Sequence, residues 1–158
     1  MEKKNKLPLR IGVGIVLLNK DNNIFVGKRI DNPKNSWQMP QGGVDKNEDF
    51  LKAAKRELEE ETGVKSIKLI KKLDGWYQYD LPKYLLGKVW KGKYRGQKQK
   101  WFVMKFLGNP DEINVKTKNP EFFKWKWIEV SELPIVAVHF KLNIYKKIKE
   151  ELTSLNLN

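Results

Sequence analysis

The chain has 158 residues, 40% of them hydrophobic and 32% charged, and a formal net charge of +13 at pH 7. This composition indicates a soluble globular protein, which we expect to form a single domain over residues 1–158. The sequence contains no cysteine, which excludes disulfides, thiolate metal sites and a cysteine nucleophile. The same absence fits a reducing compartment, so we expect a cytoplasmic protein.

The first segment has a basic beginning and an apolar run from Ile11 to Leu18, as signal peptides do. This run contains two glycines, ends in Asn-Lys-Asp-Asn-Asn and is followed by no small-residue cleavage site. A buried β-strand therefore explains it better. No segment approaches the roughly 20 apolar residues that a membrane span needs, so we expect no membrane partner.

Residues 10–19 and 24–29 are predicted to be two strands joined by a turn at residues 20–23. After a polar loop over residues 31–36, residues 37–39 are predicted to form a short strand that Pro40 ends.

A helix is predicted over residues 48–62, with Asp45 or Asn47 as its N-cap and Gly63 at its end. Further strands, rich in β-branched and aromatic residues, are predicted at residues 66–73, 76–80, 101–107 and 124–130.

The tail from about Phe140 to Leu155 is predicted to be a second helix. Its apolar residues fall on one stripe, namely Ile144, Ile148, Leu152 and Leu155. Strands combined with two helices, without strict alternation of strand and helix, indicate an α+β fold with a mixed sheet.

The first predicted helix carries four glutamates within five positions, Glu57 and residues 59–61. A helix advances about 100° per residue, so Glu57, Glu60 and Glu61 share one face. Glu59 falls outside that arc and is expected to face solvent. An adjacent apolar stripe would dock on the sheet, and it consists of Leu51, Ala54 and Leu58.

Like charges on one helix face repel each other, and a divalent cation would relieve that repulsion. Hard cations such as Mg²⁺ take oxygen ligands and share a few carboxylates with substrate phosphates. A solvated acidic helix face is the alternative, and these acids alone do not decide between the two.

The residues around these glutamates favour the metal site over a solvated acidic face. The stretch GGVDKNEDFLKAAKRELEEETGV, residues 42–64, fills every fixed position of the 23-residue Nudix signature. That signature is Gly, five residues, Glu, seven residues, Arg-Glu, an aliphatic residue, any residue, Glu-Glu, any residue, Gly and an aliphatic residue. The chain thus resembles the Nudix hydrolases.

This resemblance implies a Nudix-type α/β/α sandwich with a mixed central sheet. It implies Mg²⁺- or Mn²⁺-dependent hydrolysis of a nucleoside diphosphate linked to another group. The implied metal ligands and catalytic groups are Glu57, Glu60 and Glu61, one of which helps to activate water. Gly42 would offer its carbonyl to a metal, and a Glu48–Arg56 salt bridge would brace the loop.

Outside the signature, the chain resembles bacterial RNA pyrophosphohydrolases and the similar dinucleoside polyphosphate hydrolases. The segments that carry this resemblance are WQMPQGG (37–43), YDLPKYL (79–85), RGQKQKWF (95–102), PEFFKWKWI (120–128) and HFKLNIYKKI (139–148). The resemblance implies a further metal ligand at Glu121 and contact between Arg10 and the 5′ phosphates.

The same resemblance implies a cleft for a base, formed by Arg29, Phe140 and Lys141 with Val138 beside it. Stacking between an aromatic ring and a guanidinium is a suitable way to hold an unpaired base. For Phe140 the alternative is ordinary helix packing.

No acidic residue occurs between Asp80 and Asp111, where lysines accumulate and aromatic residues interleave. A basic loop with aromatics suits a phosphate-rich ligand, although it could also be a solvated lysine face. We expect substrate contacts here and just before it, from Tyr79, Lys83, Gln97, Lys98 and Gln99. For Tyr79 the alternative is simple pairing in a sheet. Residues 86–95 remain unassigned. His139, the single histidine, has the chemistry of a general base but is expected to be structural or incidental.

The predicted function is that of an RNA 5′ pyrophosphohydrolase, which converts 5′-tri- or diphosphorylated RNA to 5′-monophosphorylated RNA and opens the transcript to decay. A dinucleoside polyphosphate hydrolase acting on diadenosine tetraphosphate is the alternative. A non-catalytic RNA-binding module is disfavoured, because all the signature glutamates are present. We expect a monomer, and an activating protein partner remains open.

Overall fold

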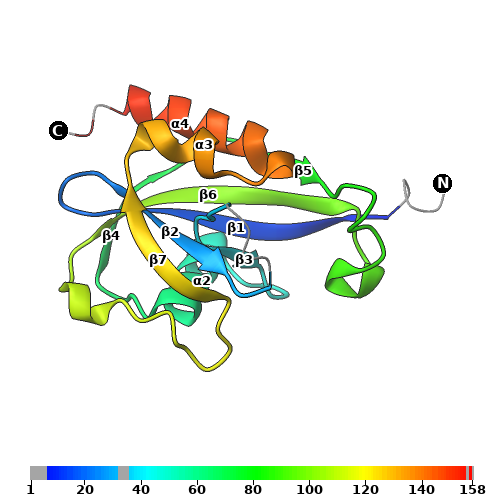
Figure 1. The fold of residues 1–158 in the computed structure, drawn as a ribbon, viewed down its shortest axis with the longest axis horizontal. Helices are drawn as coiled ribbons and strands as arrows, with labels where there is room; N and C mark the ends of the chain where they lie inside the picture. Colours follow the sequence, from blue (N-terminus) through cyan, green and yellow to red (C-terminus); the bar gives the residue numbers. More distant parts are fainter. Residues whose placement is uncertain (1–6, 32–35, 156, 158) are drawn as a thin grey trace.

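A mixed sheet lies at the centre of the computed structural model, which describes residues 7–31, 36–155 and 157. The strand order is β4-β6-β1-β2-β7, with β3 paired to β1 and β5 paired to β6 (Figure 1). The strands are β1 (Leu9–Leu18), β2 (Ile24–Arg29), β3 (Gln41–Gly43), β4 (Ile67–Lys72), β5 (Tyr77–Asp80), β6 (Gly96–Phe106) and β7 (Phe122–Ile128).

Helices cover both faces of the sheet (Figure 1). Helix α2 (Phe50–Thr62) lies on one face, and α3 (Leu133–Val136) and α4 (Leu142–Ser154) lie on the other. Short 3₁₀ turns occur at Val89–Gly92, Pro110–Glu112, Val130–Glu132 and His139–Lys141. This arrangement confirms the expected α+β fold and α/β/α sandwich. No helix in the described ranges has the length and apolar content to cross a membrane.

The sheet separates two hydrophobic cores, because successive side chains of a strand point to opposite faces. On β1, Val13 and Ile15 pack into the core under α2. Val16 and Leu18 pack into the core under α3 and α4. The apolar run at the start of the chain is therefore the buried strand that its sequence indicated.

Strands β1 and β6 pair in parallel, whereas the other strand pairs are antiparallel. Their register runs from Leu9 opposite Gly96 to Leu18 opposite Lys105. Arg10 therefore lies opposite Gln97, although the two are far apart in sequence. Strand β3 pairs with the other edge of β1, with Gly42 opposite Val13.

The predicted helix start was wrong. Helix α2 begins at Phe50, and its N-cap is Asp49, whose carboxylate accepts a hydrogen bond from Lys52 N. Neither Asp45 nor Asn47 caps the helix, and Asn47 has a φ of 63°, in the left-handed region. The predicted end is confirmed, since Gly63 is the C-cap with a φ of 76°.

Two predicted strands also differ from the structure. Residues 37–39 form only an isolated bridge through Gln38, and the strand begins after Pro40 as β3. Strand β6 starts at Gly96 rather than at residue 101, so the expected basic loop is partly a strand. The strand predicted at 24–29 is confirmed at its bounds as β2.

The predicted apolar stripes are close to those observed. Helix α2 buries Ala54 and Leu58 as expected, together with Ala53, whereas Leu51 is only half-buried and packs against the same core. Helix α4 buries Ile144, Ile148 and Leu152 as expected, together with Tyr145.

Candidate active site

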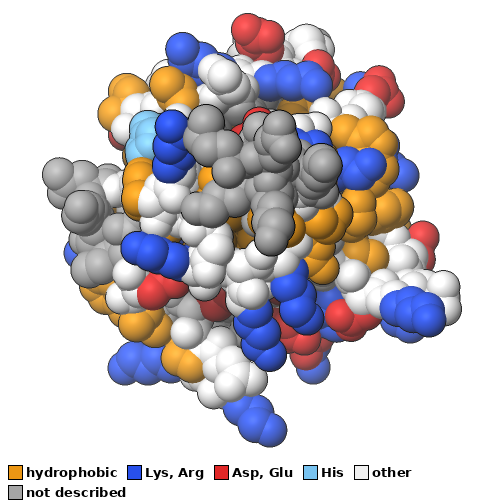
Figure 2. All heavy atoms as spheres, turned by 90° about the vertical axis from the view of Figure 1, so that its right-hand side faces the viewer, with side chains coloured by type: hydrophobic (Ala, Val, Ile, Leu, Met, Phe, Trp, Pro, Cys, Tyr) orange, Lys and Arg blue, Asp and Glu red, His pale blue; other side chains and the backbone are white. Residues whose placement is uncertain are grey.

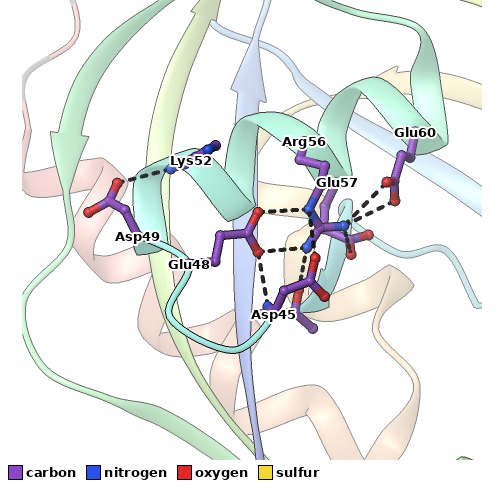
Figure 3. A network of polar contacts seen from close by, with 8 residues as sticks. Asp45, Glu48, Asp49, Lys52, Arg56, Glu57 and Glu60 are labelled. Carbon is purple, nitrogen blue, oxygen red and sulfur yellow. Dashed lines mark hydrogen bonds and ion pairs between the residues drawn. The ribbon is translucent and has the colours of Figure 1, made fainter.

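Arg56 joins helix α2 to the loop that precedes it (Figure 3). Its Nε and Nη2 donate to the two carboxylate oxygens of Glu48 at 2.8 and 2.9 Å. Nη2 also donates to the Gly43 carbonyl at 2.9 Å, and Nη1 donates to Glu57 Oε1 at 2.9 Å. A planar guanidinium makes this bidentate arrangement possible, and a lysine could not reproduce it. The geometry is that of the brace expected between Glu48 and Arg56.

The brace changes the pKa of its carboxylate. Hydrogen bonds from the Arg56 side chain, followed by one from the Asp45 backbone, lower the pKa of Glu48 to about 2. The Glu48 hydrogen bonds in turn raise the pKa of Arg56. Both groups therefore stay charged across the physiological range, and the loop over residues 43–49 is held against the helix.

The signature glutamates differ in their exposure. The side chain of Glu57 is 13% exposed and that of Glu60 is 58% exposed, while Glu61 as a residue is only 2% exposed. Glu60 forms an ion pair with Arg56 at 3.2 Å near the surface (Figure 3). Arg56 thus offsets part of the repulsion among these acids. Glu59 is exposed, as expected, and pairs with Lys65 at 3.6 Å.

Burial makes the inner carboxylates difficult to ionise. Desolvation, with the nearby charges of Glu60 and Glu121, raises the pKa of Glu57 to about 7, although Arg56 acts in the opposite direction. Desolvation, with the charges of Glu121 and Glu57, raises the pKa of Glu61 well above its usual value. Neighbouring carboxylates on α2 and before β7 therefore add to the cost of ionising Glu57 and Glu61.

These residues fit a divalent cation by their chemistry. Glu61 Oε1 is buried and has no hydrogen-bond partner among the described residues, and Glu61 Oε2 accepts from Gln41 N at 3.3 Å. A cation would satisfy that unpaired oxygen and offset the repulsion from Glu57 and Glu121. Oxygen donors of this kind suit Mg²⁺ and Mn²⁺. Within the described ranges, no three acidic or histidine side chains already stand close enough together to hold a metal ion.

Gly42 lies directly against Glu57. An added Cβ at Gly42 would meet Glu57 Cδ at 2.0 Å and Oε2 at 2.1 Å. A glycine at this position therefore lets the β3 backbone approach the helix closely. This contact brings the main chain of Gly42 and the Glu57 carboxylate into one place.

A cleft of about 1020 Å³ lies on the α4 face and reaches this place. Gly42, Glu57 and Glu121 line one part of it, and six predicted substrate residues line other parts. The latter are Arg10, Arg29, Tyr79, Val138, Phe140 and Lys141. The structure therefore brings most of the predicted site residues together in one cavity.

Aromatic rings and a buried ammonium form the deeper wall of the cleft. The rings of Tyr79 and Phe140 lie 5.7 Å apart, tilted by 40°. Lys141 Nζ donates to Gln38 Oε1 at 3.1 Å and lies 5.3 Å from the Tyr79 ring. Desolvation, followed by the charge of Arg29, lowers the pKa of Lys141 to about 7. Phe140 is half-buried here, so a flat group in the cleft can reach its ring.

The two cleft arginines are held differently. Arg29 donates from Nε and Nη2 to the two oxygens of Asp31, both at 2.7 Å, which fixes the plane of its guanidinium. Its Nη1 is 4.0 Å from a carboxylate oxygen of Glu121. The Arg10 guanidinium instead lies over the Trp90 ring, 5.2 Å from the centroid.

The two glutamines at the start of β6 lie on the cleft side of the sheet. Gln97 and Gln99 are fully buried, and Gln99 Nε2 donates to Gln41 Oε1 at 2.9 Å. Tyr79 OH donates to Gln97 Oε1 at 3.0 Å. Both glutamines therefore lie behind Tyr79 and Gln41, which line the cleft.

Two other predicted contacts lie outside the cleft. Lys98 points to the opposite face, with its Nζ 4.6 Å from the Trp76 ring. Lys83 is exposed and does not line the cleft. Successive side chains of a strand point to opposite faces, so Lys98 points away from Gln97. The loop predicted for this segment would have allowed both to face the ligand.

Several cleft residues were not predicted from the sequence. They are Asp31, Trp37, Gln38, Gln41, Tyr84, Trp90 and Tyr145. Five of these belong to the segments that carry the resemblance outside the signature. Those segments could therefore have pointed to them. Trp90 gives residues 86–95 a place in the site, because the turn at Val89–Gly92 brings its ring to Arg10.

Basic side chains are not confined to the cleft. Figure 2 views the end of the molecule on the right of Figure 1, and blue lysine and arginine side chains are spread over it among hydrophobic and acidic ones. The net charge of +13 therefore does not by itself locate a ligand. The position of a ligand has to be inferred from the contacts of individual residues.

Comparisons with known proteins show which family and which relatives the chain resembles. A family model described as NUDIX domain matches residues 8–148. The chain is 62% identical over 154 residues to the RNA pyrophosphohydrolase of Pelagibacter ubique (strain HTCC1062), covering 98% of each chain. It is 47% identical to the RNA pyrophosphohydrolase of Rickettsia canadensis (strain McKiel), covering 98% of this chain and 96% of the relative.

Solved structures share the fold. The E. coli dihydroneopterin triphosphate pyrophosphohydrolase superposes with a TM-score of 0.68 at 18% identity, covering 92% of this chain and 99% of the other. A C. elegans Ap4A hydrolase binary complex superposes with a TM-score of 0.65 at 23% identity, with the same coverage. At these identities the likeness concerns the fold alone.

Proposed function

The chain belongs to the NUDIX domain family and is a pyrophosphohydrolase, and we propose that its substrate is the 5′ end of RNA. It would convert 5′-tri- or diphosphorylated RNA to the 5′ monophosphate and so promote RNA decay. The observation that carries this proposal is full-length similarity, since a protein named RNA pyrophosphohydrolase is 62% identical over 98% of both chains.

The acidic end of the cleft is the proposed place of phosphate hydrolysis. Glu57, Glu60, Glu61 and Glu121, with the carbonyl of Gly42, would hold Mg²⁺ or Mn²⁺. A bound divalent cation neutralises charge on the phosphates and makes water a stronger nucleophile. The unpaired Oε1 of Glu61 and the raised pKa of Glu57 support this assignment. Glu60 would have to turn inward from its ion pair with Arg56.

The brace has a positioning role in this proposal. Arg56 links Glu48, Gly43 and Glu57 through hydrogen bonds of 2.8 to 2.9 Å. Loss of either partner would let Glu57 and the backbone of Gly42 move apart. Positioning of this kind is worth orders of magnitude in rate, because errors of about 1 Å can cost about 100-fold.

The other end of the cleft is the proposed place of the nucleotide. Arg10 would meet the phosphates, and Phe140, with Val138 and Lys141 beside it, would hold a base against Arg29. Asp31 supports the proposed stacking of a base on Arg29, because it fixes the plane of the Arg29 guanidinium. Aromatic stacking contributes about 1–3 kcal/mol per base in single-stranded complexes.

A direct competition tests the function. The protein and Mg²⁺ are incubated with equal concentrations of a short 5′-triphosphorylated RNA and diadenosine tetraphosphate, and both products are followed. We expect monophosphorylated RNA and released phosphate or pyrophosphate to dominate. Consumption of the dinucleotide while the RNA persists would instead make this a nucleotide-clearing hydrolase, and Phe140 and Lys141 would then form an adenosine site.

Two variants control the assay. Glu57→Gln should abolish hydrolysis and leave the fold intact, because an amide lacks the charge that a cation requires. Glu59→Gln is the matched control on the same helix, where the side chain is exposed and contacts Lys65. Full activity of Glu57→Gln would show that the metal role assigned to this residue is wrong.

A further inference from the structure

Three lysines lie close to the indole ring of Trp37. The Nζ atoms of Lys28, Lys124 and Lys126 lie 5.3, 5.6 and 4.3 Å from the centroid of that ring. Lys28 belongs to β2, and the other two belong to β7, the neighbouring strand at the edge of the sheet (Figure 1). Trp37 itself lines the cleft. The four residues, named here the Trp37 cluster, therefore continue the wall of the cleft outward.

The positive charges of the Trp37 cluster repel one another. Lys28 and Lys124 are register partners on antiparallel strands, and Lys126 follows two residues later on β7. Like charges directly opposite one another destabilise a strand pair. Among the residues that the structure describes, none of the three lysines forms an ion pair with a carboxylate. An anion bound here would remove that repulsion.

Protection of an open sheet edge is the simplest other explanation, because edge strands often carry lysines that prevent pairing with other chains. It accounts for Lys124 and Lys126 on β7. It does not account for Lys28, which lies on the inner strand β2. Nor does it account for an aromatic ring held among the three ammonium groups.

We propose that the Trp37 cluster binds the single-stranded RNA that leaves the cleft on the 3′ side of the processed 5′ end, an inference that rests on the proposed function. Single strands are bound by aromatic rings on which bases stack and by basic side chains that meet the phosphates. The Trp37 cluster supplies both groups next to the cleft. A dinucleoside polyphosphate has no phosphodiester chain to extend this far, so the cluster selects for RNA.

The test compares substrates of different length with the variant Lys124→Gln/Lys126→Gln. The substrates are an unstructured 5′-triphosphorylated RNA of ten nucleotides, a 5′-triphosphorylated dinucleotide and diadenosine tetraphosphate. We expect kcat/KM to fall about tenfold on the long RNA and to stay unchanged on the two short substrates. Fluorescence anisotropy with a 5′-monophosphorylated ten-nucleotide RNA measures affinity without turnover. The plot of log affinity against log salt concentration should be less steep for the variant than for the wild type. The difference in slope should be about 1.4, since each lysine that no longer meets a phosphate accounts for about 0.7.

A matched control removes the same charge elsewhere. Lys72→Gln/Lys147→Gln also replaces two lysines that lie over aromatic rings, Phe50 at 5.8 Å and Tyr77 at 4.1 Å, outside the cleft. We expect this variant to match the wild type with every ligand. An equal loss in both variants, or an equal loss on long and short substrates, would overturn the proposal.

The two proposals fail in different ways. A wild-type protein that leaves triphosphorylated RNA intact would refute the proposed function. The anisotropy measurement would then still decide on the Trp37 cluster, because equal affinity of the wild type and Lys124→Gln/Lys126→Gln for the single strand overturns it. If the wild type processes RNA and the variant does so equally well, the function stands and the cluster has no part in it.

Discussion

Replacing Gly42 by alanine would place a Cβ atom against the carboxylate of Glu57. The new atom would lie 2.0 Å from Glu57 Cδ, 2.1 Å from Oε2 and 2.5 Å from Oε1. Carbon atoms in contact are separated by at least about 3.5 Å, so the carboxylate must retreat by roughly 1.5 Å. A misplacement of about 1 Å can cost about 100-fold in rate. We therefore expect kcat/KM to fall by at least about 100-fold.

The backbone should tolerate Gly42→Ala. Gly42 is not among the residues with positive φ, so a side chain is compatible with its conformation. The displaced group is the end of a flexible side chain, which can swing away while the pairing of β3 with β1 is kept. The thermal midpoint, followed by circular dichroism, should therefore stay near that of the wild type.

The assay for Gly42→Ala is the initial rate of hydrolysis of 5′-triphosphorylated RNA over a range of Mg²⁺ concentrations. Displacement of Glu57 should raise the Mg²⁺ concentration that gives half-maximal rate as well as lower kcat/KM. Glu59→Ala, an exposed change on the same helix, serves as the control. A folded Gly42→Ala protein with wild-type kcat/KM and unchanged Mg²⁺ dependence would refute the reasoning.

Three further predictions concern stability. Tyr145→Phe removes the oxygen that accepts a hydrogen bond from Met39 N at 2.8 Å. It should cost about 1–3 kcal/mol in urea unfolding, and an unchanged midpoint would contradict this. The pKa of Lys141 is about 7 against the usual 10.5, so between these values the unfolded chain binds more protons and stability rises with pH. Lys141→Met should weaken that rise, measured by denaturant unfolding at pH 7 and at pH 10. The pKa of Glu48 is about 2 against the usual 4.5, so its contribution is present above pH 4.5 and is lost as the pH falls towards 2. Glu48→Gln should therefore narrow the difference in stability between pH 7 and pH 3, and an unchanged difference would count against the brace.

More of the acidic end of the site could be predicted from the sequence than of the end proposed to hold the nucleotide. The spacing of Glu57 and Glu61 on a helix places both on one side, and the structure places Glu57 against Gly42 and Glu61 against Gln41 N. The exposure of Glu60 could not be predicted, because it depends on the ion pair that Arg56 makes with it. Side chains on one helical face share a direction, but their burial is decided by elements packed against them.

The start of β6 shows why a polar strand is difficult to recognise. Lysines and glutamines alternate at Gln97–Lys100, so a pattern based on apolar residues indicates a loop. The structure satisfies the buried glutamines with Gln41 and Tyr79, which come from distant parts of the chain. A strand of this kind is stabilised by hydrogen bonds that no local pattern reveals.

The N-cap of α2 was missed for a different reason. Asp45, Asn47 and Asp49 all have suitable side chains within five residues. Asp49 is the one whose carboxylate accepts a hydrogen bond from Lys52 N, and a local pattern does not show where the chain turns into the helix. The position of Trp37 beside three lysines likewise depends on the pairing of β2 with β7.

The parallel pairing of β1 with β6 has a consequence for how the chain folds during synthesis. Strand β1 ends at Leu18, and its partner begins at Gly96. At about 5–20 residues per second, a ribosome needs roughly 4–16 s to make the intervening segment. During that interval one edge of an apolar strand has no partner, because β2 and β3 pair with the other edge. Non-local strand pairing is also slow in itself. The nascent chain is therefore most open to aggregation before Gly96–Phe106 is complete, and the cleft cannot form before then.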